Sequence, residues 1–263
     1  MGIVDPTLRD ATRLSEQDPS SRNIWVLTAA QSLGGASSPI IISLGGLVGQ
    51  QLALDPANAT LPVSMLNLGL ALGTLPAAAL MERLGRRTAY VFGATVGATA
   101  GVVATLGIVE ASFVVFCIGT LLAGLYSAYV QSYRFAATDG MVGAARDTAI
   151  SRVMVGGLVA AVIGPQLVIW TRDALPGHPF AGSFLSQAAL ATLAIPILLA
   201  LRRPKAFTAG TAGSATGRSL SKILRSPRYM LAVATGVVSY GLMTFVMTAA
   251  PMAMVGHGHS VDS

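Results

Sequence analysis

"ALMERLGRRTAY", residues 79–90, places four charged side chains within six positions, between two long apolar runs. These are Glu82, Arg83, Arg86 and Arg87, and Gly85 among them permits a tight turn. A basic cluster of this kind can bind nucleic acid, anchor a membrane loop or form part of a moving gate. The composition and the charge distribution of the rest of the chain decide among these three roles.

The composition predicts a membrane protein. The 263-residue chain is 53% hydrophobic and 11% charged, with a mean hydropathy of +0.66. Because a soluble domain carries about 25% charged residues, this chain has too few to cover a globular surface. Residence in a lipid bilayer explains the deficit. The net charge of +6 would also suit a nucleic-acid-binding protein, so the positions of the basic residues matter.

Seven apolar segments are long enough to cross a bilayer as helices, which takes about 20 residues each. We therefore predict an all-α integral membrane protein. The predicted spans cover residues 23–50, 61–81, 88–109, 112–135, 148–171, 181–201 and 228–252.

The connecting segments predict the orientation, because basic residues collect in cytoplasmic loops. With the N-terminus in the cytoplasm, the inner segments and the adjoining helix ends hold sixteen of the seventeen Lys and Arg residues. The outer segments hold only Arg172. This asymmetry predicts a multi-pass protein with a cytoplasmic N-terminus, and it accounts for the positive charge without nucleic acid.

The spans and loops divide the chain into five parts. A cytoplasmic arm, 1–22, precedes a six-helix transmembrane half, 23–201. The segment 202–227 is rich in Gly, Ser, Thr and Ala and contains no acidic residue, which is typical of a flexible cytoplasmic linker. A seventh transmembrane helix, 228–252, and an outer tail, 253–263, follow.

The basic loop resembles a known sequence signature. "LMERLGRR", residues 80–87, is similar to the G-x-L-x-D-R-x-G-R-[RK] motif of the major facilitator superfamily, which lies between that family's second and third helices. Glu82 stands in for the aspartate of the motif, and Ala78 replaces its leading glycine. The residues that match are Leu80, Arg83, Gly85, Arg86 and Arg87.

Two further stretches are similar to the same superfamily. "GGLVAAVIGP", residues 156–165, ends in Gly164 and Pro165 and resembles the Gly-Pro motif of the family's fifth helix. "YVQSYRFAATD", residues 129–139, carries Arg134 at the inner end of the fourth span and also resembles the superfamily. More loosely, the chain is similar to a bacterial branch that includes proposed riboflavin transporters. The similarity implies location in a bacterial inner (plasma) membrane.

The resemblance implies a secondary transporter that moves a small organic solute by alternating access between two six-helix halves. It implies that Glu82 and Arg83 latch one half against the other in the outward-open state, with Gly85, Arg86 and Arg87 shaping the latch. A full member has twelve helices, whereas seven are predicted here. A C-terminally truncated, inactive fragment that lacks its partner helices is therefore an alternative.

The chain departs from the family where proton coupling is expected. The resemblance places an arginine four residues before Gly124, and Thr120 is there instead. No Asp, Glu, Lys or Arg lies at mid-depth in any predicted span. Because buried charges in membranes usually mark ion routes, the sequence offers no candidate proton carrier. No cofactor is expected.

In the family, helices 1, 4 and 7 line the substrate cavity. Large polar side chains at mid-depth on these spans need partners, because an unsatisfied polar group in lipid is costly. Hydrogen bonding between helices, without any ligand, explains them equally well. As solute contacts, uncharged amides and phenols suit a neutral or mostly neutral organic molecule. The candidates are Gln31, Tyr126, Gln131, Tyr240 and Thr244.

Charged residues around the second inner loop form a candidate cytoplasmic lock for the rocking motion, and a solvated loop is an equal alternative. The lock candidates are Arg134, Asp139 and Arg146. His257 and His259 lie two residues apart, but two histidines on a tail seldom hold a metal, so no metal site is predicted.

Two other classes of membrane protein fit less well. A seven-helix receptor or photoreceptor has its N-terminus outside, and a retinal protein needs a lysine in its last span, where 228–252 has none. A membrane enzyme needs a nucleophile–base pair, metal-ligand spacing or a phosphate-binding Gly loop ending in Lys, and the sequence shows none of these. The chain is therefore predicted not to be an enzyme.

Overall fold

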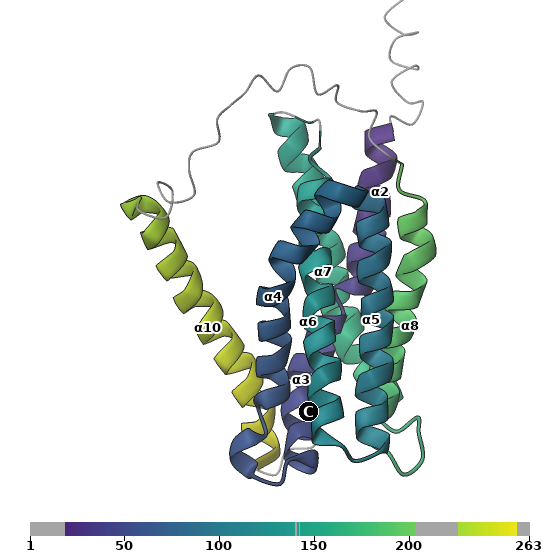
Figure 1. Ribbon diagram of the computed structural model, residues 1–263, viewed down its shortest axis with the longest axis vertical. Helices are drawn as coiled ribbons and strands as arrows, with labels where there is room; N and C mark the ends of the chain where they lie inside the picture. The colour runs from purple at the N-terminus through teal and green to yellow at the C-terminus, as the bar shows by residue number, and fades with distance from the viewer. Residues whose placement is uncertain (1–18, 140, 142, 203–225, 257–263) are drawn as a thin grey trace, which may run out of the picture. The chain divides into compact units, whose positions relative to one another are not determined.

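The computed structural model describes residues 19–139, 141, 143–202 and 226–256. These residues are α-helical apart from turns and one short 3-10 helix (Figure 1). Most of the predicted arm, linker and outer tail, and with them His257 and His259, lie outside the described residues. The chain divides into two units, residues 1–205 and residues 206–263.

Among the described residues, seven helical segments are long and apolar enough to cross a membrane, as predicted. Helices α2 and α3 together form the first segment. The second unit contributes α10, Pro227–Gly256. The elements of the first unit are α2 Pro19–Gly34, α3 Ser37–Leu52, η1 Pro56–Asn58, α4 Leu61–Leu84, α5 Arg86–Val109, α6 Phe113–Ala136, α7 Ala144–Thr171 and α8 Ala181–Leu199.

Local sequence signals set the helix ends. Gly85 joins α4 directly to α5 with a φ of 81°, a value that glycine adopts without strain. Ser112 caps the start of α6, where its hydroxyl accepts a hydrogen bond from the backbone N–H of Val115 at 3.5 Å. Because the chain reverses at Gly85 within a single residue, Arg83 and Arg86 lie at the same end of the first unit.

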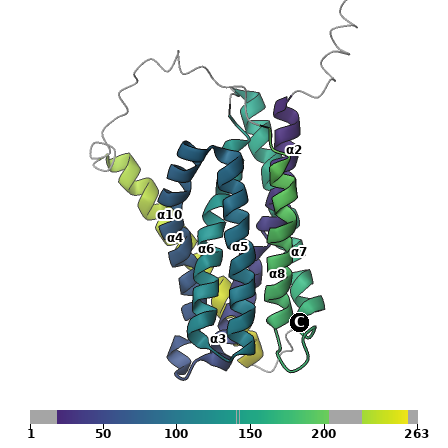
Figure 2. The ribbon, with the colours of Figure 1, turned by 45° about the vertical axis from the view of Figure 1, so that its right-hand side comes forward.

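Glycines let the helices of the first unit approach closely. Helix α5 packs against α6 and α8, α4 packs against α6, and α2 packs against α7 and α8 (Figures 1 and 2). The rings of Tyr129 and Tyr126 on α6 lie directly over Gly93 and Gly97 of α5, where a β-carbon would overlap them. Since lipid provides no hydrophobic drive between helices, this close packing holds the bundle together.

The first predicted span, 23–50, is a broken helix. Helix α2 ends at Gly34 and α3 begins at Ser37. Adjacent glycines, Gly34 and Gly35, weaken the helix, and Pro39 has no N–H to donate to the carbonyl of Gly35. The local sequence is therefore compatible with the break, and the span as a whole is where the hydropathy predicts it.

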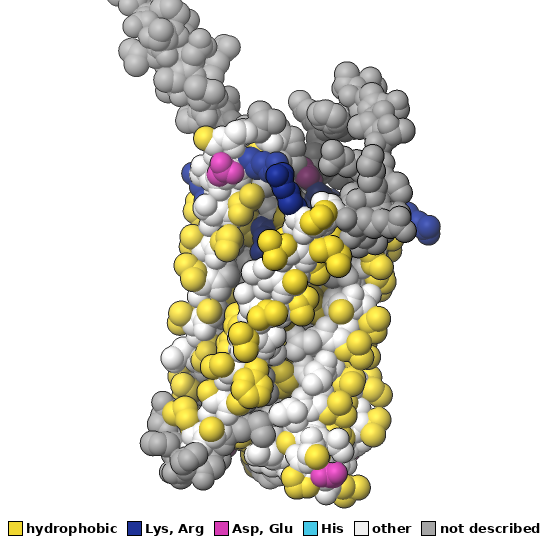
Figure 3. Space-filling model, turned by 90° about the vertical axis from the view of Figure 1, so that its left-hand side faces the viewer, with side chains coloured by type: hydrophobic (Ala, Val, Ile, Leu, Met, Phe, Trp, Pro, Cys, Tyr) yellow, Lys and Arg dark blue, Asp and Glu magenta, His cyan; other side chains and the backbone are white. Residues whose placement is uncertain are grey.

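Exposed apolar side chains cover the sides of the helices, and arginines collect at one end of the first unit (Figure 3). Leu75 is 80% exposed and Leu158 is 69% exposed, which is normal against lipid and unusual in water. We call the end where α4 meets α5 the arginine-rich end. Its described basic residues are Arg22, Arg83, Arg86, Arg87, Arg134, Arg146, Arg152 and Arg202.

Candidate functional site

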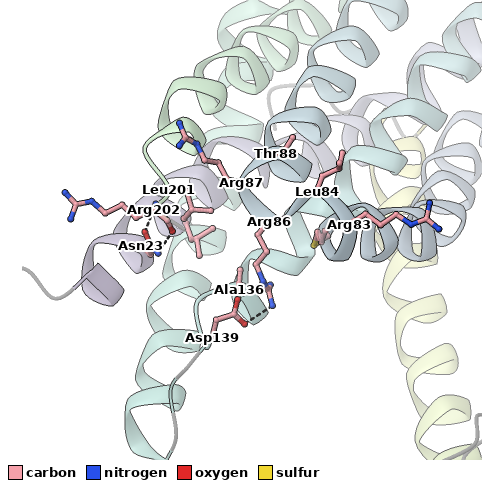
Figure 4. A pocket seen from close by; sticks show the side chains of 13 residues that line it. Asn23, Arg83, Leu84, Arg86, Arg87, Thr88, Ala136, Asp139, Leu201 and Arg202 are labelled. Atoms are coloured by element: carbon pink, nitrogen blue, oxygen red, sulfur yellow. Dashed lines mark hydrogen bonds and ion pairs between the residues drawn. The ribbon is translucent and has the colours of Figure 1, made fainter. Parts of the chain in front are cut away.

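An ion pair joins the predicted loop motif to the predicted cytoplasmic lock. Arg86, the first residue of α5, meets Asp139 in the turn after α6. Arg86 Nε lies 2.6 Å from Asp139 Oδ2, and Arg86 Nη2 donates a hydrogen bond to Oδ1 at 2.8 Å (Figure 4). This bidentate contact fixes the guanidinium more tightly than a single hydrogen bond would.

The surroundings of the ion pair tie it to the helix packing. The side chains of Arg86 and Asp139 are 32% and 33% exposed. Burial raises the pKa of Asp139 above its ordinary value, and the charge and hydrogen bond of Arg86 oppose that rise. Arg86 Nη1 also donates to the hydroxyl of Tyr90 at 3.4 Å, and Ser132 Oγ donates to the same hydroxyl at 3.1 Å. A polar network thus connects the loop to the α5–α6 contact.

The other residues of the loop motif lie outside this ion pair. Glu82, Arg83 and Arg87 are exposed, and Gly85 has open space where a β-carbon would be. In the part of the chain that the structure describes, neither Glu82 nor Arg83 forms an ion pair. The latch role of Glu82 and Arg83 therefore stays a prediction.

Two of the three lock candidates lie apart from Asp139. The guanidinium of Arg134 lies 5.0 Å from the ring centroid of the neighbouring Phe135, and Arg146 is exposed in the first turn of α7. Within the described ranges neither arginine takes part in an ion pair. Of the three predicted lock residues, Asp139 forms an ion pair in the described structure, and its partner is Arg86.

Two cavities open at the arginine-rich end of the first unit. One, of about 530 Å³, lies between α4 and α6, and its walls include Glu82, Gln131 and Arg134. The other, of about 460 Å³, lies among α2, α5 and the end of α8 (Figure 4). The lining of this second cavity is Asn23, Leu27, Met81, Arg83, Leu84, Gly85, Arg86, Arg87, Thr88, Ala136, Asp139, Leu201 and Arg202.

The predicted solute contacts on the first and fourth spans lie in different environments. Tyr126 is fully buried, and its hydroxyl lies against Gly34 at the break, without a hydrogen-bond partner among the described residues. Gln31 is half-buried on α2, and its amide nitrogen faces Gly157 of α7. Gln131 is exposed on α6 and lines the 530 Å³ cavity. The structure does not gather these side chains into one pocket.

Tyr240 and Thr244, the remaining predicted contacts, lie on α10 in the second unit. Their part in a cavity with the first and fourth spans stays a prediction.

The Gly-Pro motif of α7 packs on the broken first span. A β-carbon on the buried Gly164 would lie 3.0 Å from Cβ of Pro39, so the glycine lets α7 approach α3. Pro165 is exposed, and α7 continues through it.

Several residues of the site are not predicted from the sequence. The Asn23 amide donates to the carbonyl of Arg202 and accepts from its N–H, both at 3.0 Å, which joins the start of α2 to the end of α8. Tyr90 and Ser132 belong to the network around Arg86. Asn23 directly follows Arg22 at a span boundary, but nothing in the sequence indicates a contact 179 residues away.

Curated relatives share sequence with nearly the whole chain. The riboflavin transporter RfnT of Brucella anthropi is 65% identical over 249 residues, which cover 95% of this chain and 63% of RfnT. The uncharacterized MFS-type transporters YdeG and YddS of Bacillus subtilis are 32% and 26% identical, each over 92% of this chain and over 59% and 58% of their own lengths. The chain thus spans about three-fifths of the length of these relatives.

No solved structure matches the chain. The family model described as Major Facilitator Superfamily matches residues 24–263, which include the loop motif, the Gly-Pro motif and, apart from residues 21–23, the seven apolar helical segments of the described residues. This multi-pass membrane protein therefore belongs to the major facilitator superfamily.

Proposed function

We propose that the chain forms part of a secondary transporter that carries riboflavin by alternating access. The observation that carries the proposal is its 65% identity to a riboflavin transporter over 95% of the chain. Both the family match and the seven apolar helices support a membrane carrier.

The polar chemistry of the spans suits this solute. Riboflavin is uncharged at neutral pH and offers many hydrogen-bonding groups on a flat ring and a hydroxylated chain. The spans carry amides and hydroxyls at mid-depth and no Asp, Glu, Lys or Arg there. We propose that Gln31 and Gln131 contact the solute through their amides, with Tyr240 and Thr244 contributing from the seventh span. Tyr126, which is fully buried beside Gly34, becomes a contact when the first span moves at its break.

We further propose that the arginine-rich end faces the cytoplasm of a bacterial cell and that the protein resides in the inner membrane. Positive charge is disfavoured on the translocated side, and the opposite end of the first unit carries Asp55, Glu110 and Asp173 beside Arg172. In this orientation the Arg86–Asp139 pair holds the inner ends of α5 and α6 together. Glu82 and Arg83 then lie exposed, where they can latch a second half of the transporter.

Uptake of radiolabelled riboflavin tests the proposal. The chain would be expressed in a riboflavin-auxotrophic bacterium that lacks its own uptake system, both alone and as a hybrid in which it replaces the matching part of the RfnT sequence. We expect riboflavin accumulation by the hybrid, and a loss of roughly tenfold or more in Gln31→Ala and Gln131→Ala, because each removes a hydrogen bond to the solute.

Gln166→Ala is the matched control, because Gln166 is an exposed amide on α7, a helix to which no solute contact is assigned. A hybrid that reaches the membrane in normal amount yet takes up no riboflavin would reject riboflavin as the solute. Equal losses in all three glutamine variants would instead reject the assigned contacts.

A further inference from the structure

The 460 Å³ cavity at the arginine-rich end is strongly basic. Its lining contains four arginines and one acidic residue, Asp139. The acidic residue is engaged by Arg86 through the bidentate contact, so its charge is already matched. Within the described residues, Arg83, Arg87 and Arg202 form no ion pair. Counting the described residues alone, the walls of the cavity therefore carry an excess of three positive charges.

Helix ends do not supply this charge. The C-terminus of α4, with its negative partial charge, and the N-terminus of α5, with its positive one, meet at Gly85. The two contributions oppose each other there, so the guanidinium groups dominate the potential in the cavity.

The backbone positions of two of the arginines are set by their surroundings. Arg87 is in the first turn of α5, beside the anchored Arg86. The backbone of Arg202 is held by the two hydrogen bonds to Asn23, which also lines the cavity. Figure 4 shows Arg86 directed at Asp139, whereas Arg87 and Arg202 extend on the side of Asn23, away from that carboxylate.

Much of the remaining lining is apolar. Leu27, Leu84 and Leu201 share the cavity with the arginines. Its volume falls within the range of about 300–1,000 Å³ that is typical of small-molecule sites. A ligand that fits such a wall carries negative charge on an oxygen-rich group and tolerates apolar neighbours.

We propose that this cavity binds a phosphate group, with Arg87 and Arg202 as its main contacts and Arg83 at the rim. Guanidinium groups match phosphate oxygens in geometry and charge. The cavity lies at the end of helices that are long enough to span a membrane, and basic pockets between such helices suit anionic headgroups. The phosphate belongs either to an anionic phospholipid, which the leucines favour, or to a free phosphate compound.

Native mass spectrometry of the full chain in detergent micelles tests the proposal. Phosphatidylglycerol and phosphatidylcholine would be titrated separately, and the dissociation constant of the first bound lipid measured. We expect preferential binding of phosphatidylglycerol. In Arg87→Gln/Arg202→Gln its affinity should fall roughly tenfold or more, since two charge-assisted contacts are lost.

Arg146→Gln/Arg152→Gln is the charge-matched control, because both arginines are exposed on α7 and neither lines the cavity. Its loss should be clearly smaller than that of the cavity variant. Circular dichroism and elution volume would establish that each variant is folded. Equal losses in the two double variants, or none in either, would overturn the proposal, because binding would then reflect the general charge of this end.

A second arm identifies the source of the phosphate. In the first experiment, inorganic phosphate would replace chloride at constant ionic strength during the phosphatidylglycerol titration. In the second, the same replacement would be made with phosphatidylcholine as the only lipid, and the midpoint of thermal unfolding would be measured. Lipid binding that resists millimolar phosphate assigns the site to a headgroup. If phosphate displaces the lipid and raises the thermal unfolding midpoint of the parent but not of Arg87→Gln/Arg202→Gln, the site is assigned to free phosphate. Neither result depends on whether the protein carries riboflavin.

Discussion

At the scale of single residues, one ion pair joins the arginine-rich loop to the turn after α6. Four charged residues stand within six positions, yet Arg86 is the one that meets an acidic residue in the described structure, and that residue lies 53 positions away. The loop sequence identifies the cluster, and the second inner loop identifies Asp139 as a candidate. Their pairing depends on how α5 and α6 pack, which neither stretch specifies alone.

Breaking this ion pair should destabilise the protein asymmetrically. Arg86→Gln leaves the half-buried carboxylate of Asp139 without its cation and should lower the free energy of unfolding by about 1 kcal/mol, a modest value because both groups are a third exposed. Asp139→Asn in that background should recover part of the loss. The parent, Arg86→Gln, Asp139→Asn and the double variant would be unfolded in mixed detergent micelles and followed by circular dichroism. Together they give a double-mutant cycle. Additive effects of the two changes would contradict the pairing.

The pH dependence of stability has a definite sign. Burial raises the folded-state pKa of Asp139 above the ordinary value of 3.8, so the folded chain retains this proton to higher pH than the unfolded chain does. The contribution of Asp139 to stability should therefore be present below pH 3.8 and decrease as the pH rises through the raised pKa. Arg86→Gln should shift that decrease to higher pH, since Arg86 lowers the pKa. Identical pH profiles for the parent and Arg86→Gln would exclude this effect.

The contact between Tyr126 and Gly34 makes a second test at this scale. The Tyr126 hydroxyl is buried without a partner among the described residues, so Tyr126→Phe should change stability by less than about 1 kcal/mol. Gly34→Ala should cost more, because its β-carbon would overlap that hydroxyl. In the Tyr126→Phe background the same change should cost less. A cost that is unaltered by Tyr126→Phe would mean that the glycine is needed for the backbone and not for the ring.

At the scale of elements, hydropathy locates the spans but does not describe their interiors. All seven apolar segments are helical, and their ends are set by recognisable residues such as Gly85 and Ser112. Hydropathy does not reveal the break at Gly34 and Gly35, because the segment stays apolar across it. Two glycines and a nearby proline are the local signal, but lipid-embedded helices often contain such residues without breaking.

Adjacent glycines of α7 provide a matched test of helix packing. A β-carbon on Gly156 would overlap the backbone carbonyl of Thr28 on α2, whereas one on Gly157 would meet its nearest neighbour, the Gln31 amide, at 3.8 Å. Gly156→Ala should therefore lower the free energy of unfolding by about 1–3 kcal/mol. Gly157→Ala should be neutral or stabilising, by up to about 1 kcal/mol from helix propensity. Similar melting midpoints for the two variants would contradict the close α2–α7 contact.

At the scale of the whole molecule, composition and charge predict most of the architecture. The low charged fraction predicts membrane residence, and the basic loops predict which helix ends lie together. The loop motif identifies the family, which the family match confirms. The 460 Å³ cavity could not be predicted, because it is assembled from the start of α2, the α4–α5 turn and the end of α8. Such sites depend on contacts between distant segments, and sequence periodicity carries no information about them.

The orientation of the first unit in the membrane underlies the transport proposal. Single cysteines introduced into a Cys117→Ala background test it with a membrane-impermeant maleimide on intact bacteria. Asn58→Cys lies in the exposed η1 at one end of the unit, and Ala145→Cys lies in the exposed first turn of α7 at the arginine-rich end. We expect Asn58→Cys to be labelled in intact cells and Ala145→Cys to be labelled only after the membrane is permeabilised. Labelling in the reverse order would place the arginines outside and contradict the account.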